Sequence, residues 1–267
     1  MNTKSVGIVA AICAVVGVSA IFLLTDTDNT SEVFENNQEI SKLYIPTTFS
    51  EPIKISQSVE NAQPSPNVII SDEGKIYVLY QDTVVNEIGT NLYLKTSTDN
   101  GKTFSEPVRI AEDNFEFDGC VHVGAPMEID SKGNLHTVWY TGKQGAPGMY
   151  YSTSTDNGKT FSEPIEVLVS DWIPPQRIFL TVDVNDTVWV TWEDATGLST
   201  NDRSWRYGDT QAMIYTAQIH DGEVIMADKP VNINESKSLT AIDSSQDMVS
   251  IVWTEKDNSI MIATNQQ

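Results

Sequence analysis

The sequence has few basic residues and few cysteines. Sixteen lysines and arginines stand against 37 acidic residues in 267, and the formal net charge is −21. Such a surface repels phosphate backbones and anionic headgroups, which argues against nucleic acid as a partner. Cys13 falls in an apolar N-terminal run, so the folded part holds one thiol, Cys120, and no internal disulfide. Helical periodicity is absent beyond the N-terminus, and no Gly-x-Ser-x-Gly nucleophile elbow occurs.

The one long hydrophobic run lies at the N-terminus. Residues 6–24 are apolar or small, follow a short positive segment and precede an acidic one. A run of this length spans a bilayer as a helix, and the flanking charges place the rest of the chain outside. Val18-Ser19-Ala20 offers a small-x-small cleavage site, so an anchor and a cleaved signal peptide are both open. We expect a signal-anchor or signal peptide at 1–24, an acidic flexible stalk at 25–43, and a domain at the cell surface, or secreted if the run is cleaved.

Internal repeats dominate the chain beyond residue 43. The octapeptide Ser-Thr-Asp-Asn-Gly-Lys-Thr-Phe occurs at 97–104 and again, unchanged, at 154–161. A strand-like segment that ends in an aromatic residue recurs at 76–80, 135–139, 188–192 and 249–253. Period-2 alternation and the turn residues between segments are typical of an antiparallel meander. The sequence therefore predicts an all-β fold over residues 44–267, a β-propeller of four blades with four strands each.

The last unit shows only three strand segments, near 238–243, 247–254 and 259–264. The segment 52–56, Pro-Ile-Lys-Ile-Ser, resembles the outer strand that follows each octapeptide. We expect it to pair with the C-terminal strand and close the ring, which also hides edge strands. An open stack, or a partial propeller completed by oligomerisation, is the alternative, and the sequence does not fix the oligomeric state.

The octapeptide has a structural explanation. Its aspartate can accept hydrogen bonds from backbone N–H groups two or three residues on, and its glycine can adopt a positive φ. Its phenylalanine can pack beneath the turn. We therefore assign a structural role, rather than chemistry on a substrate, to Asp99, Gly101, Phe104, Asp156, Gly158 and Phe161.

Two copies of Ser-x-Asp-x-Gly-x-Thr-Phe resemble the Asp box, or bacterial-neuraminidase repeat, of the sialidase superfamily. The resemblance covers residues 44–267 through the repeat pattern. It implies a propeller whose Asp boxes join the third and fourth strands, on the face opposite the active site. The loops after each second strand, and those entering each first strand, then form the functional face.

The longest loop on that face, 194–211, contains Arg-Ser-Trp-Arg-Tyr at 203–207. Arginine and tryptophan together favour recognition of sugars or peptides through bidentate hydrogen bonds and stacking. A loop that plugs the channel, with its arginines paired to Asp202 and Asp209, is an equal alternative. The candidate ligand-binding residues are Arg177, Arg203, Trp205, Arg206 and Tyr140.

For an active sialidase, the resemblance implies three arginines around the substrate carboxylate, a tyrosine nucleophile assisted by glutamate, and a further acidic residue. The chain has four arginines, of which Arg109 is expected on an outer strand and two share one loop, whereas the family draws its three from different blades. If the chain is an enzyme, Tyr207 with Glu193 would form the nucleophile pair, and Asp82 or Asp118 the acid/base group. A glycosidase that uses Glu193 and Glu255 stays open.

The leading hypothesis is a membrane-tethered, sialidase-like propeller that binds a glycan or a cell-surface protein on its loop face without turnover. An exo-α-sialidase-type glycoside hydrolase and a structural cell-envelope protein are the alternatives. We predict no cofactor and no metal, because the segment 116–122 carries ligand-type side chains at a spacing that matches no established site.

Overall fold

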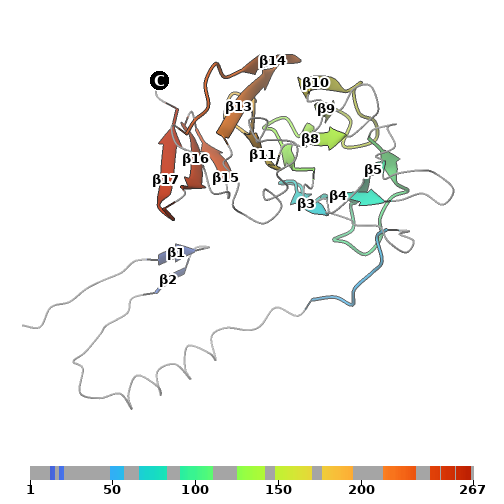
Figure 1. Cartoon of the computed structure of the whole chain (residues 1–267). Helices are drawn as coiled ribbons and strands as arrows, with labels where there is room; N and C mark the ends of the chain where they lie inside the picture. The colour runs from blue at the N-terminus through green and yellow to red at the C-terminus, as the bar shows by residue number, and fades with distance from the viewer. Residues whose placement is uncertain are drawn as a thin grey trace, which may run out of the picture. The chain divides into compact units, whose positions relative to one another are not determined.

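A computed structural model of the chain describes residues 13–15, 18–20, 49–56, 66–82, 91–110, 125–141, 148–169, 176–194, 213–232, 241–246, 248–255 and 257–265. These residues form strands and turns, in two compact units, 1–53 and 54–267 (Figure 1). Over the same residues no helix is long and apolar enough to cross a bilayer.

In the first unit, two short strands pair antiparallel. They are β1 (Cys13–Val15) and β2 (Val18–Ala20), with Cys13 opposite Ala20. Both lie in the run for which the sequence predicts a helix, and their valines suit an extended backbone. The rest of that run and the stalk at 25–43 fall outside the described residues, so the membrane or signal helix stays a prediction.

The second unit consists of four antiparallel sheets, which we call blades 1 to 4, in chain order. Their strands are β3 (Asn67–Ile70), β4 (Ile76–Asp82), β5 (Asn91–Ser97) and β6 (Val108–Arg109) in blade 1; β7 (Met127–Ile129), β8 (Leu135–Thr141), β9 (Gly148–Ser154) and β10 (Ile165–Val169) in blade 2; β11 (Gln176–Val182), β12 (Val188–Asp194), β13 (Met213–His220) and β14 (Glu223–Met226) in blade 3; and β15 (Ala241–Ser245), β16 (Met248–Thr254) and β17 (Ile260–Thr264) in blade 4. Every blade is a meander, with its first strand innermost. The predicted all-β propeller fold, with one blade for each repeat, is confirmed.

The second strand of each blade carries the repeat's aromatic residue into the interior. Tyr80, Trp139, Trp192 and Trp253 are all buried. Each of the first three stacks or tilts against a tyrosine on the third strand, as in the pair Trp139–Tyr150, whose ring centroids are 6.4 Å apart. Cross-strand aromatic pairs of this kind stabilise a sheet.

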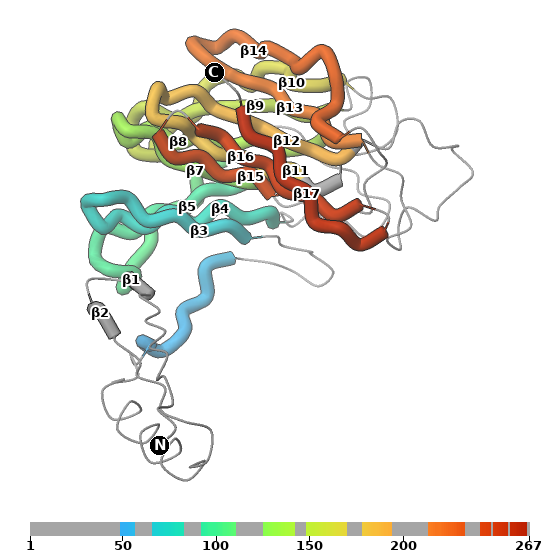
Figure 2. Tube along the Cα trace, turned by 90° about the vertical axis from the view of Figure 1, so that its left-hand side faces the viewer, coloured from blue at the N-terminus to red at the C-terminus, as the bar shows by residue number. Residues whose placement is uncertain are grey.

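The core lies between the blades, because alternate residues of each strand point to opposite sheet faces. One buried cluster joins Leu79 and Leu94 of blade 1 to Met127 and Leu135 of blade 2. A second cluster joins blade 2 to blade 3, and a third joins blade 3 to blade 4. The inner strands β3, β7, β11 and β15 neighbour one another in that order (Figure 2).

The two octapeptides form nearly identical turns between the third and fourth strands. In the second copy the Asp156 carboxylate accepts hydrogen bonds from Thr160 N at 2.9 Å, Thr160 Oγ1 at 2.6 Å and Ser154 Oγ at 2.9 Å. Asp99 does the same with Thr103 and Ser97. These bonds lower the pKa of both aspartates to about 2. Around Asp156 the backbone donors lie three and four residues on, so one donor is where we expected it and the other lies one position beyond.

Both residues of each Asn-Gly pair adopt positive φ, 59° and 80° at Asn100 and Gly101, and 61° and 78° at Asn157 and Gly158. Asparagine tolerates this region better than most residues. Both glycines thus have the positive φ that the sequence analysis expected of them, and Phe161 packs on the cluster between blades 1 and 2.

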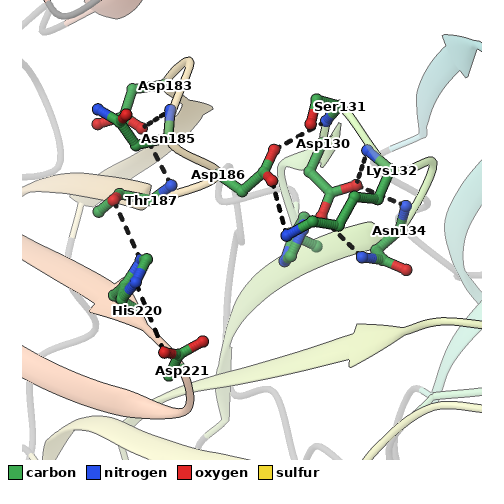
Figure 3. A network of polar contacts seen from close by, with 11 residues as sticks. Asp130, Ser131, Lys132, Asn134, Asp183, Asn185, Asp186, Thr187, His220 and Asp221 are labelled. Atoms are coloured by element: carbon green, nitrogen blue, oxygen red, sulfur yellow. Dashed lines mark hydrogen bonds and ion pairs between the residues drawn. The ribbon is translucent and has the colours of Figure 1, made fainter.

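A second recurring turn joins the first two strands of the blades (Figure 3). Its turn-forming residues are recognisable in the sequence, but the role of its aspartates was not predicted. The Asp130 carboxylate accepts from Lys132 N, Asn134 N and Asn134 Nδ2, at 2.7 to 2.9 Å. Asp183 likewise accepts from the amides two and four residues on. Asp186, in the blade 3 turn, accepts from Ser131 N at 3.0 Å and pairs with Lys132 Nζ at 2.9 Å, so the turns of blades 2 and 3 are tied together.

The strand pairing expected to close the ring is not formed. Strand β17 bonds only to β16, and blade 4 has three strands among the described residues. Residues 54–56 contain no strand, and the Ile55 carbonyl accepts a hydrogen bond from Lys95 Nζ on blade 1 at 2.9 Å. A side chain of the first blade thus holds the backbone that was expected to pair with the last.

Gly158→Ala and Gly101→Ala make a matched pair. Both glycines have φ near 80°, so both substitutions strain the backbone. A Cβ at Gly158 would also lie 2.4 Å from Leu94 in the core of blade 1, whereas at Gly101 the nearest atom is Ile76 Cδ1, at 3.4 Å. We expect Gly158→Ala to lower the free energy of unfolding by roughly 1–3 kcal/mol more than Gly101→Ala, in urea titrations. Equal losses would contradict the packing of this turn on blade 1.

Asp156→Asn should lower the thermal midpoint above about pH 5. The folded pKa, about 2, lies below the ordinary value of 3.8, so the ionised aspartate stabilises the fold above the ordinary pKa, and this contribution disappears as pH falls to about 2. The midpoint difference between wild type and variant, measured by calorimetry, should therefore shrink between about pH 4 and 2. Glu163→Gln, at an exposed position in the next segment of the chain, is the control. A difference independent of pH would refute this account.

Candidate functional site

The candidate site lies at the ends of the second strands, away from the octapeptide turns. In blade 1, Ile76 pairs with Ser97 at the turn end, and Asp82 pairs with Asn91 at the other end. Thr141 and Asp194 occupy the corresponding ends of blades 2 and 3. The structure thus places these strand ends on the face that the sequence analysis selected, which we call the loop face.

Two carboxylates of the candidate set are buried at this face. Asp82 and Glu193 expose 5% and 1% of their surface. Burial of a carboxylate is costly without compensating interactions, so buried acids at a sheet rim are candidates for function. They belong to different blades and different sheet faces.

Asp82 lies next to an aromatic pair on blade 1. Tyr80 and Tyr93 have ring centroids 6.0 Å apart. Burial, and then the nearby charge of Asp82, raise the pKa of Tyr80 to about 12. The Tyr80 phenol therefore stays protonated at neutral pH.

Glu193 lies at the joint between blades 3 and 4. It sits opposite Gln176 on β11 and Ile214 on β13. Ile214 belongs to the cluster that includes Trp253 of blade 4. On the same sheet face, Thr181 Oγ1 lies 2.8 Å from Ser244 Oγ of blade 4. The Glu193 side chain is therefore enclosed between two blades.

Tyr140, a predicted ligand contact, belongs to the core between blades 2 and 3. It packs in one cluster with Leu180 and Trp192 and is buried. Burial raises the pKa of its phenol. The structure assigns it a packing role, and ligand contact by this residue stays untested.

The structure does not describe the side chains of six further candidates. Arg177 is part of β11, but its side chain is not described. The other five lie outside the described residues: Asp118, Arg203, Trp205, Arg206 and Tyr207. The proposed arginine set therefore lies outside the described side chains, and the roles of these residues stay predictions. Within the described ranges, no group of three or more His, Cys, Asp or Glu side chains could hold a metal ion.

The sequence analysis also missed three buried polar side chains that contact one another. They lie at the end of the blades that carries the turns, opposite the loop face, and we call this end the turn face. His136 Nδ1 lies 2.6 Å from Tyr151 Oη, and His136 Nε2 lies 3.3 Å from the Asp130 carboxylate. Burial lowers the pKa of His136, and it raises the pKa of Tyr151 to about 12. All three side chains are buried, so these contacts tie β8, β9 and the preceding turn together and serve structure. The spacing of Asp130 from Asn134 was the one available signal, since that turn was recognised but its carboxylate was not assigned.

The chain is similar to several solved structures at low sequence identity. No family model and no curated protein matches it. An α-L-arabinanase from Penicillium chrysogenum, complexed with arabinobiose, is 11% identical with a TM-score of 0.51, over 75% of this chain and 61% of that one. A polysaccharide lyase, a ulvan lyase bound to an oligosaccharide, is 14% identical with a TM-score of 0.50, over 74% and 51%. A leech intramolecular trans-sialidase is 15% identical with a TM-score of 0.44, over 74% and 30%.

The likeness to the arabinanase and to the ulvan lyase shows the fold alone. The chain spans between about a third and about three fifths of the length of the three proteins. It is a β-propeller protein.

Tyr140→Ala tests whether this residue packs or only contacts ligand. Because the ring is buried in the cluster between blades 2 and 3, we expect its loss to lower the free energy of unfolding by roughly 3–5 kcal/mol in denaturant titrations. Tyr140→Phe keeps the ring and should cost about 1 kcal/mol or less. An alanine variant as stable as the wild type would place Tyr140 outside the core.

Proposed function

We propose that this chain is an extracytoplasmic, sialidase-like propeller that binds a glycan, or a glycan-bearing surface protein, through its loop face without turning it over. The N-terminal run at 6–24 would tether it to a membrane. The Asp-box resemblance of the two octapeptides agrees with the four-blade fold.

The structural neighbours support a carbohydrate as the ligand. The arabinanase was solved with arabinobiose and the ulvan lyase with a sulfated oligosaccharide, and both align with about three quarters of this chain. Because the sequence identity is low, these structures support the chemical class of the ligand and do not indicate which glycan it is.

The burial of Glu193 is the observation that carries binding without turnover. In the sialidase-type reading, this carboxylate would have to assist a tyrosine nucleophile at the substrate. It is 1% exposed and lies between blades 3 and 4, beside the cluster formed by Ile214 and Trp253. A side chain in that place supports the blade joint better than it supports catalysis.

The loop 194–211 supplies the binding groups in this proposal. Arg203 and Arg206 are half of the chain's four arginines, and Trp205 lies between them in an otherwise acidic sequence. Guanidinium groups form bidentate hydrogen bonds with carboxylate or sulfate groups, and an indole ring stacks on a sugar face. An acidic glycan is therefore the favoured ligand, since a local basic patch offsets the general negative field.

A glycan array probed with residues 40–267 tests the proposal. Wild type should bind acidic glycans, and Arg206→Ala should weaken binding by about tenfold or more, as loss of a central arginine contact does. Arg109→Ala, an exposed position on strand β6, is the matched control and should bind as wild type.

A parallel assay with fluorogenic glycosides, including a sialoside, separates binding from hydrolysis. We expect no product. Turnover abolished by Tyr207→Phe or Glu193→Gln would replace this proposal with the hydrolase, and a folded protein without ligand or product would favour a structural envelope role.

A further inference from the structure

The two ends of the row of blades expose apolar sheet faces. Strand β3 of blade 1 presents Val68 and Ile70 on the face turned away from blade 2; we call this the front face. Strand β17 of blade 4 presents Ile260 and Ile262 on the face turned away from blade 3; we call this the back face. All four side chains are more than half exposed. Large exposed apolar residues that share one face mark an interaction surface.

The front face repeats positions that are buried in the other blades. Val68 pairs with Val78, which lies two residues before Tyr80. Met127 and Leu180 likewise pair with the residues that lie two before Trp139 and two before Trp192. Met127 is 1% exposed and Leu180 5%, because each packs against the preceding blade, whereas Val68 is 61% exposed. At strand β3, blade 1 thus carries an unfilled half of the joint that blades 2 and 3 complete, whereas Tyr80, on β4 and the same face, is buried.

The back face supplies the other half of that joint. Ile260 pairs with the residue that follows Trp253. In blades 1 to 3, the residues that pair with the position after the repeat's aromatic residue are Leu92, Met149 and Ile214. Those three are at most 1% exposed, whereas Ile260 is 79% exposed. Ile262 has the register of Leu94, which is fully buried against blade 2, yet it is 64% exposed.

Strand β17 also lacks the usual protection of an edge. Its sequence, Ile-Met-Ile-Ala-Thr, contains no charged residue and no proline, although one residue in five of the chain is charged. Natural edge strands discourage pairing with charges, prolines or bulges. A neutral face also avoids the repulsion that a net charge of −21 would otherwise place between two copies.

We propose that the back face of one copy packs against the front face of a second copy, and repeats between chains the joint that links blades within each chain. A second copy fits because each chain carries both halves of the joint. Since the two halves are different surfaces, the association is head-to-tail, and it closes into a ring only where the rotation between copies allows.

Within a chain, Met127 and Leu94 belong to one buried cluster. Their counterparts, Val68 and Ile262, should therefore become neighbours across the interface between copies. This pair gives the inference a geometric test that does not depend on which ligand the loop face binds.

The first experiment measures self-association of the full chain, in detergent, by sedimentation velocity over a range of concentrations. Wild type should form species larger than a monomer. Ile260→Lys should raise the dissociation constant by more than about tenfold, since it places a charge in the centre of an apolar joint. Val184→Lys is the matched control, because Val184 is also apolar and more than half exposed but lies in the turn between β11 and β12. A monomeric wild type, or equal effects of the two substitutions, would overturn the proposal.

The second experiment identifies the contact. Val68→Cys and Ile262→Cys are made in separate chains that carry Cys13→Ser and Cys120→Ser, and a short bismaleimide is added. We expect a cross-linked dimer when the two variants are mixed, and little with either alone. A chain that carries both cysteines and cross-links only within itself, at every concentration, would show closure inside one molecule and overturn the second copy as the partner.

Discussion

The fold depends on burying sheet faces against the neighbouring sheets. Strand β8 shows this most directly, because its alternate side chains belong to two cores: Trp139 packs in the cluster with blade 1, and Tyr140 packs in the cluster with blade 3. Leu79 packs on blade 2, while Tyr80, its neighbour, lies on the opposite face. A single blade with two apolar faces would be insoluble, and a row of them is stable because each covers the next.

The turns at the ends of the strands make contacts between neighbouring blades. Gly158 lies against Leu94 of the preceding blade, and Asn157 Oδ1 accepts from Lys75 Nζ at 2.8 Å. Asp186 ties the turns of blades 2 and 3, and Val184 N donates to Gln246 O between blades 3 and 4. These described contacts gather on the turn face, which leaves the strand ends of the loop face for a ligand.

Repetition explains why the fold could be read from the sequence. An octapeptide present twice and an aromatic strand present four times fix the number of blades without knowledge of any contact. The hydrogen-bonding role of the second turn was not predicted because its first residue varies, with Ser71, Asp130 and Asp183 at equivalent places, and only the backbone shows that these turns are alike. Tyr140 was predicted to lie on the loop face because the sequence does not distinguish the end of a strand from the start of a loop. The pairing of residues 52–56 with β17 was inferred from likeness to other outer strands, and likeness does not determine which of two edges a segment contacts. The chemistry of the loop 194–211 depends on loop geometry, which no periodicity specifies.

The partners of Asp99 and Asp156 have a consequence for ionic strength. Both carboxylates accept from backbone amides and hydroxyl groups, which are neutral donors at hydrogen-bond distance. Added electrolyte screens charge–charge interactions over about 10 Å at 0.1 M, and it weakens such short contacts with neutral donors very little. The same electrolyte relieves the mutual repulsion of 37 acidic side chains. We therefore expect a propeller held by these turns to become more stable, rather than less stable, at high salt concentration.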